Sequence, residues 1–223
     1  MRVKDGIIIA NAADKIKAEL IDFLLDCHDN FDLIANETPF LQSERMADMI
    51  AIRNGITMGF EIKSNTDDLR TLSQQLSDYT RVFNAVYLVF SAKFAGSPEI
   101  EKLPKTIGLF TVDTDNNLKF RRKAATKVIL DKSAMLSLLW RKDLETLAPS
   151  KKKADFDDLR DYVLRNCPIK TIQEQIIKSL QSRYGNGYKL MIHERGEKTT
   201  IEDLFYITGL KKHQIVFADT SIA

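Results

Sequence analysis

The stretch ADMIAIRNGITMGFEIK, residues 47–63, decides the fold. Its two apolar runs flank the pair Asn54-Gly55, which tolerates positive φ and is a strong short signal for a hairpin turn. We therefore expect a β-hairpin with one strand over 47–52 and the next over 57–63. In such a hairpin Asp48 and Glu61 lie on neighbouring strands.

The elements around this hairpin follow from the spacing of apolar residues. Spacings of three and four predict amphipathic helices, and short apolar runs predict strands. We expect a helix over 11–29, an extended segment over 31–40, a helix around 69–83, and strands over 85–90, 106–112 and 118–122. This order is typical of an α/β fold with a mixed central sheet flanked by helices.

The last part of the chain is mainly helical in pattern. A helix is expected over 128–147, before the basic, proline-containing run at 149–153. Such a run is a candidate boundary, which divides a core over 1–148 from a helical extension over 149–223. Within the extension we expect helices over 156–165 and 169–184, a turn at 185–187 and a strand over 188–193. The extension could bind a protein partner or mediate self-association.

Composition excludes some classes of protein. The chain has 33 basic and 31 acidic residues and a net charge of +2, so attraction to nucleic acid requires a local patch. No apolar run approaches the roughly 20 residues needed to span a bilayer. Cys27 and Cys167 are far apart and lack ligand spacing, which argues against a disulfide scaffold and a structural zinc site. A cytoplasmic location is expected.

The second strand of the hairpin carries the residues with chemical potential. Glu61 and Lys63 are two apart, so their side chains share one face of the strand. With Asp48 nearby, two carboxylates converge, which is unfavourable unless a cation neutralises them. Oxygen ligands favour Mg²⁺ or Mn²⁺. Lys63 could then orient a water or stabilise negative charge on a phosphate.

Several segments together resemble the PD-(D/E)xK nuclease superfamily, and within it small bacterial branches that include the MmcB-like DNA repair proteins. The resemblance lies in Glu37, SERMADMIA at 43–51, GFEIKS at 59–64, QLSDY at 75–79 and YLV at 87–89. It covers roughly residues 31–112 and departs from the motif at Ala47, where the superfamily often has proline. It implies a restriction-endonuclease-like core.

The resemblance also implies roles for individual residues. Asp48 and Glu61 would be metal ligands together with the backbone carbonyl of Ile62, and Lys63 would be the catalytic lysine. Glu37 matches the acidic residue that precedes the aspartate strand and would be a further ligand. Gln75 matches a polar helix position that often contacts the site or the substrate.

These observations favour a metal-dependent nuclease that hydrolyses phosphodiester bonds in DNA. A Glu-x-Lys triplet alone is common by chance, and the argument rests on its strand, hairpin and helix context. Two alternatives stay open. One is a catalytically inactive nucleic-acid-binding or adaptor module with the same fold, since fold does not guarantee activity. The other is a nuclease directed at RNA.

Overall fold

The computed structural model describes residues 2–4, 7–9, 11–27 and 31–208. Its centre is a six-stranded sheet in which strand order follows sequence order. The strands are β3 (Leu33–Phe40), β4 (Arg45–Arg53), β5 (Ile56–Lys63), β6 (Ala85–Ser91), β7 (Gly108–Val112) and β8 (Leu118–Arg122). The pairs β5–β6 and β6–β7 are parallel, and the other neighbours are antiparallel. The predicted mixed α/β fold is confirmed.

The hairpin predicted from Asn54-Gly55 is also confirmed. β4 and β5 pair antiparallel, and Arg53 lies opposite Ile56 across the turn. Asn54 and Gly55 have φ values of 51° and 75°, in the left-handed region that asparagine and glycine tolerate best. A second, short pair of strands, β1 (Arg2–Lys4) and β2 (Ile7–Ile9), is separate from the main sheet.

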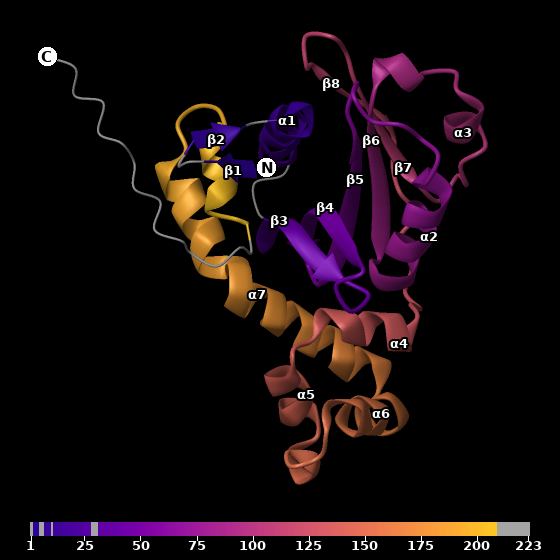
Figure 1. Ribbon diagram of the computed structural model, residues 1–223, viewed down its shortest axis with the longest axis vertical. Coiled ribbons are helices and arrows are strands. Elements are labelled where there is room, and N and C mark those ends of the chain that lie inside the picture. The colour runs from indigo at the N-terminus through magenta and orange to yellow at the C-terminus, as the bar shows by residue number, and fades with distance from the viewer. Residues whose placement is uncertain (1, 5–6, 10, 28–30, 209–223) are drawn as a thin grey trace, which may run out of the picture.

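Helices lie on both sides of the sheet, with α1 on one side and α2 and α3 on the other (Figure 1). Short 3₁₀ turns occupy 92–94, 136–138, 149–151 and 202–205. The helices are α1 (Ala12–Cys27), α2 (Leu72–Val82), α3 (Pro98–Glu101), α4 (Lys132–Met135), α5 (Arg141–Leu147), α6 (Phe156–Asn166) and α7 (Ile169–Glu194). Among the described residues, no helix is both long and apolar enough to pass through a bilayer.

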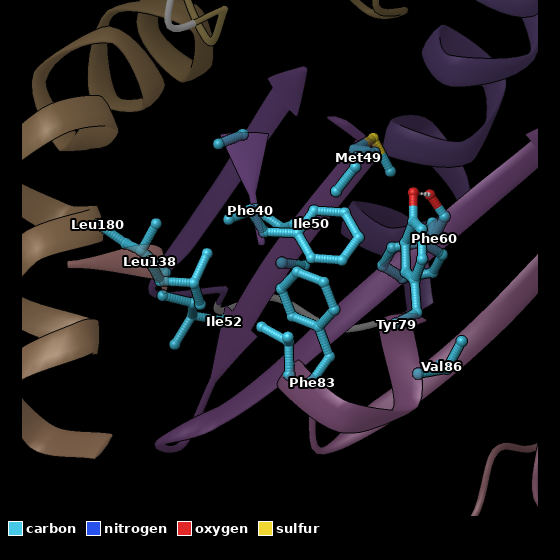
Figure 2. Close-up of a cluster of buried hydrophobic side chains, with 14 of the residues drawn as sticks. Phe40, Met49, Ile50, Ile52, Phe60, Tyr79, Phe83, Val86, Leu138 and Leu180 are labelled. Carbon is cyan, nitrogen blue, oxygen red and sulfur yellow. Dashed lines mark hydrogen bonds between the residues drawn. The ribbon is translucent and has the colours of Figure 1, made fainter. Parts of the chain in front are cut away.

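An aromatic cluster under α2 forms the centre of the core (Figure 2). The ring of Phe40 lies 5.1 Å from that of Tyr79 and 5.6 Å from that of Phe83. The same core continues to Leu138 and to Leu180 of α7, both of which are buried. Core residues therefore lie on both sides of the basic run at 149–153, which contains the 3₁₀ turn at 149–151.

Two predictions about the last part of the chain are wrong. The single helix expected over 128–147 is divided into α4, a 3₁₀ turn and α5, because the Asp131 and Asp143 carboxylates accept backbone N–H bonds that start new helices. The turn at 185–187 and the strand over 188–193 are absent, since α7 continues through Gly185 and Gly187 as far as Glu194.

The outer edge of β3 is covered by a segment from the far end of the described chain. The backbone N–H of Asn36 donates to the carbonyl oxygen of Ile207 at 2.8 Å, and its side-chain amide donates to Thr208 Oγ1 at 2.9 Å. A parallel bridge joins Asn36 and Thr208. This contact covers the outer edge of β3 near its middle and protects it there from pairing with another chain.

Candidate active site

Strand register brings three acidic residues into one row across the sheet. Residues on either side of Glu37 and Asp48 pair as Asn36–Met49 and Thr38–Ala47, so the two acids lie opposite each other. In the same way the pair Met49–Phe60 leads directly to Asp48 opposite Glu61. Opposite residues on antiparallel strands project to the same face. We call Glu37, Asp48 and Glu61 the acidic row.

Lys63 stands beside the end of the acidic row, as its spacing from Glu61 predicts. Its Nζ lies 2.9 Å from Glu61 Oε1, and both residues are buried. Removing one partner of a buried ion pair leaves the other charge uncompensated, which is strongly destabilising. The ion pair with Glu61 therefore holds the Lys63 ammonium in place within the site.

Asp48 is joined to β5 through its side chain as well as through strand pairing. The backbone N–H of Ile62 donates to Asp48 Oδ2 at 2.8 Å. In a strand, the C=O of a residue points to the same neighbour as its N–H. The carbonyl of Ile62 therefore points toward β4, just beyond the last paired residues Met49 and Phe60. That direction is the side of β5 on which Asp48 lies, and the role of this carbonyl as a ligand stays a prediction.

The environment of Asp48 opposes its negative charge. Burial, followed by the charge of Glu61, raises the pKa of the Asp48 carboxyl to about 7. The Ile62 N–H and the ammonium groups of Lys17 and Lys63 act in the opposite direction and are outweighed. Two carboxylates this close together favour a bound proton or another cation at neutral pH.

Tyr79 of α2 supports the backbone under the row, a role that its position in the sequence did not reveal. The N–H of Asp48 donates to Tyr79 Oη at 3.0 Å, and the hydroxyl donates to the carbonyl of Phe60 at 3.4 Å (Figure 2). Burial, then the charges of Asp48 and Glu61, raise the pKa of Tyr79 well above its usual value. The hydroxyl thus stays protonated and fixes β4 relative to β5.

Lys17 of α1 is a second site residue that the sequence patterns missed. Its Nζ lies 3.4 Å from Glu37 Oε1 and 3.6 Å from Asp14 Oδ1, and its side chain is only 4% exposed. Glu37 itself has a positive φ of 50°, which is uncommon for a residue other than glycine. The sequence offered one signal for it: Lys17 follows Ile16 directly and precedes Leu20 by three residues, so it lies next to the apolar face of the predicted helix.

The remaining predicted site residue, Gln75, lies on α2 and is half-buried. Its side-chain oxygen accepts a hydrogen bond from Thr71 Oγ1 at 3.0 Å, one turn earlier. Its role toward the substrate stays a prediction.

Across the described residues, no three His, Cys, Asp or Glu side chains gather closely enough to hold a metal ion. Asp48, Glu61 and the Ile62 carbonyl stay a predicted ligand set, and Glu37 contacts Lys17.

The similarity of this chain to known proteins extends over most of its length. The family described as bacteriophage P4 protein cII matches residues 10–208, a range that includes the complete acidic row. Protein cII of Enterobacteria phage P4 is 26% identical over 189 residues, which cover 80% of this chain and 70% of that protein.

Two solved structures share lower similarity. A protein of unknown function from Silicibacter pomeroyi has a TM-score of 0.41 and 18% identity, over 71% of this chain and 94% of that one. A second protein of unknown function has a TM-score of 0.28 and 14% identity, over 76% of this chain and 97% of that one. Both TM-scores are too low to support a conclusion about this chain.

Proposed function

This chain belongs to the bacteriophage P4 protein cII family, and we propose that its acidic row is the site of a Mg²⁺- or Mn²⁺-dependent nuclease that hydrolyses phosphodiester bonds in DNA. One observation carries the proposal. The Asp48 carboxyl lies opposite Glu61 in strand register, with Lys63 Nζ 2.9 Å from Glu61 Oε1. Structural ion pairs have no need of a second acid beside the first, whereas a metal site does.

The donor set fits a hard divalent cation. Asp48, Glu61 and the carbonyl of Ile62 offer only oxygen atoms, and because burial and the charge of Glu61 raise the pKa of the Asp48 carboxyl, a cation beside it would stabilise its ionised form. These three groups would hold the ion. When bound, Mg²⁺ or Mn²⁺ would supply a Lewis acid that polarises a phosphoryl oxygen and makes a water more acidic.

The side chains of the protein have separate tasks in this proposal. The Lys63 ammonium stabilises the negative charge that develops on the phosphate, and its pairing with Glu61 holds it at the site. Tyr79 holds Asp48 in place through the backbone N–H. Glu37 would join the ligands if the Lys17 ammonium moved away from it. The proposal includes a cytosolic location, which suits the free thiols of Cys27 and Cys167.

A second candidate is a non-enzymatic nucleic-acid-binding module. It is favoured by the pairing of two of the three acids with lysines, Glu61 with Lys63 and Glu37 with Lys17. In that case the lysine ammonium groups neutralise the acids in place of a metal ion, and the acidic row only stabilises the sheet. Cleavage of RNA is a third candidate function, and the experiment below detects it because its substrates include a structured RNA.

Metal-dependent cleavage by the purified full chain tests the proposal. Single-stranded, linear duplex and supercoiled DNA, and a structured RNA, are incubated with Mg²⁺, with Mn²⁺ or with EDTA. We expect cleavage of DNA only with metal. Glu61→Gln and Lys63→Met, which nearly keep side-chain volume, should each lower the rate at least about a hundredfold, the scale of one lost charge-stabilising group.

A matched control distinguishes chemistry from folding. Asp22 is also a buried carboxylate in an ion pair, 2.8 Å from Arg195, and it belongs to α1 outside the acidic row. Asp22→Asn should retain activity in proportion to the folded fraction. Equal activity of the wild-type chain, Glu61→Gln and Lys63→Met would overturn the proposal, as would activity in EDTA.

A further inference from the structure

A cleft lies where the β3–β4 loop meets the helices of the last part of the chain. It consists of a cavity of about 370 Å³ and a larger neighbouring cavity of about 500 Å³, and Gln42, Ser137 and Arg160 line both. The loop that shapes them, residues 41–43, has positive φ values of 48°, 57° and 67° and is held by a bond from Leu41 N–H to Ser137 Oγ at 2.8 Å.

The charge of the smaller cavity is entirely positive. Arg141, Arg160 and Arg183 line it, and none of its lining residues is acidic. We call it the arginine cleft. Arg141 is paired with Glu145 at 2.8 Å, but among the described residues neither Arg160 nor Arg183 forms an ion pair with a carboxylate. The carboxylate of Asp143 acts on Arg183 from a distance, while the Arg160 guanidinium contacts only oxygen atoms of Ser133 among the described residues.

Both unpaired arginines are held rigidly. Arg160 donates from one Nη to the backbone oxygen of Ser133, while its Nε is buried and has no hydrogen-bond partner among the described residues. Arg183 donates to the carbonyl of Leu138 at 2.7 Å, and burial lowers its pKa. Both side chains are half-buried, and a fixed guanidinium group with an unused donor is well suited to bind a phosphate.

Two exposed aromatic rings border the same cleft. Trp140 is 52% exposed and Phe156 is 40% exposed, high values for such large apolar side chains. The guanidinium carbon of Arg183 lies 5.0 Å from the centre of the Trp140 ring. A positively charged groove with exposed rings is the combination that binds single-stranded nucleic acid, through phosphates and stacked bases.

The cleft also lies close to the acidic row along the chain. Arg45 lines the adjoining cavity and stands three residues before Asp48 on β4, about 10 Å along a strand. We propose that the arginine cleft binds a single strand of nucleic acid, whose phosphates contact Arg160 and Arg183 and whose bases pack on Trp140 and Phe156. This inference deepens the proposed function and rests on it for the identity of the substrate, but binding itself requires no metal.

Trp140 allows a direct test because it is the only tryptophan in the chain. The full chain is titrated in EDTA with a labelled oligothymidylate, and both anisotropy of the label and Trp140 emission are followed. We expect saturable quenching of Trp140 with the same midpoint as the anisotropy change, and an affinity that falls steeply with salt. Arg160→Gln and Arg183→Gln should each weaken binding about tenfold.

Arg165→Gln is the matched control, because Arg165 is on α6 with Arg160 but is exposed and paired with Asp161. It should bind within about twofold of wild type. If Arg160→Gln or Arg183→Gln unfolds at a lower temperature than wild type, Arg141→Gln gives the same comparison in a folded chain. The Arg141 side chain is 46% exposed, so its replacement should not affect folding.

Three results would overturn the inference. They are equal affinities of the cleft variants and Arg165→Gln, binding without a change in Trp140 emission, and displacement of the oligonucleotide by polyglutamate at equal charge. Tighter binding of a duplex would overturn the choice of a single strand. Failure of the nuclease proposal is seen separately, because binding by the wild-type chain is measured in EDTA and does not depend on whether the same chain cleaves DNA with Mg²⁺.

Discussion

Asp48 makes its own contribution to the pH dependence of the stability of this fold. In the folded chain its pKa is about 7, above the ordinary value of 3.8, because burial and Glu61 oppose ionisation. The folded state therefore holds a proton that the unfolded state has released between these two values. The corresponding stability is fully present below about pH 4 and is lost as pH rises through about 7.

Asp48→Asn should remove this pH dependence. Asparagine keeps an acceptor for the Ile62 N–H but carries no charge. In EDTA the variant should be more stable than wild type at pH 8, by up to a few kcal/mol, and the difference should shrink toward pH 4. Thermal melting across this range measures it. An unchanged difference between pH 4 and pH 8 would contradict the assigned pKa. With Mg²⁺ at pH 8 only the wild type should gain stability.

Tyr79→Phe tests the support beneath the acidic row. The change removes the hydroxyl that accepts the Asp48 N–H, at a cost of about 1–3 kcal/mol for a buried donor left unpaired. If the nuclease proposal holds, metal affinity should also fall about tenfold or more, as for other groups that orient ligands. Calorimetric Mn²⁺ titration measures that affinity. Tyr184→Phe, a buried tyrosine of α7, is the control and should leave it unchanged.

At this scale the sequence predicted residues of one continuous segment better than residues that converge from elsewhere. Glu61 and Lys63 belong to one strand, and the alternation of side chains placed them together. Lys17 and Tyr79 come from helices before and after the hairpin, and their contacts depend on how those helices cross the sheet. The spacing of residues within one segment does not predict how a helix packs across the sheet.

At the scale of elements, the accuracy of prediction depended on how local the deciding signal was. The β4–β5 hairpin follows from two turn residues, and β6 from one apolar run, so both were predicted from the sequence. In α7 the tertiary context decides instead. Gly187 lies against the backbone of Tyr206, and this packing favours helix across a segment whose composition indicates a turn.

The two glycines of α7 should therefore respond oppositely to alanine. At Gly187 an added Cβ would lie 1.8 Å from the carbonyl oxygen of Tyr206, so the backbone must shift. Gly187→Ala should destabilise the chain by about 1–3 kcal/mol. At Gly185 the same atom meets nothing within 4 Å, so Gly185→Ala should stabilise the helix by up to about 1 kcal/mol. Urea unfolding of both variants checks the sign. Equal effects would show that the segment near Tyr206 does not rest on α7.

At the scale of the whole molecule, one core joins the sheet to the helices beyond the basic run. α7 packs on β3, and Leu180 is completely buried. The boundary predicted at residue 149 thus separates segments that share apolar surface. Because each segment covers apolar side chains of the other, we expect them to depend on each other for stability.

Proteolytic nicking tests that dependence. Lys151, Lys152 and Lys153 are exposed and lie between α5 and α6, so trypsin should cut there early under native conditions. The two fragments should remain associated in gel filtration and unfold in one transition. Separation of the fragments, or two independent melting transitions, would show that 1–148 and 149–223 fold as separate domains. Leu180→Ala should lower the stability of the intact chain by about 2–5 kcal/mol.

The contact between Asn36 and the segment at 207–208 has a consequence for the order of events during synthesis. Asn36 directly precedes Glu37, and its backbone N–H finds its partner only when Ile207 is present. A ribosome completes the hairpin and Lys63 long before it reaches this residue. The acidic row is thus translated early, and in a chain released before Thr208 its outermost member, Glu37, lies on an edge strand that residues 207–208 do not cover. Any activity that requires Glu37 to be held in place is therefore expected only after residues 207–208 have been added.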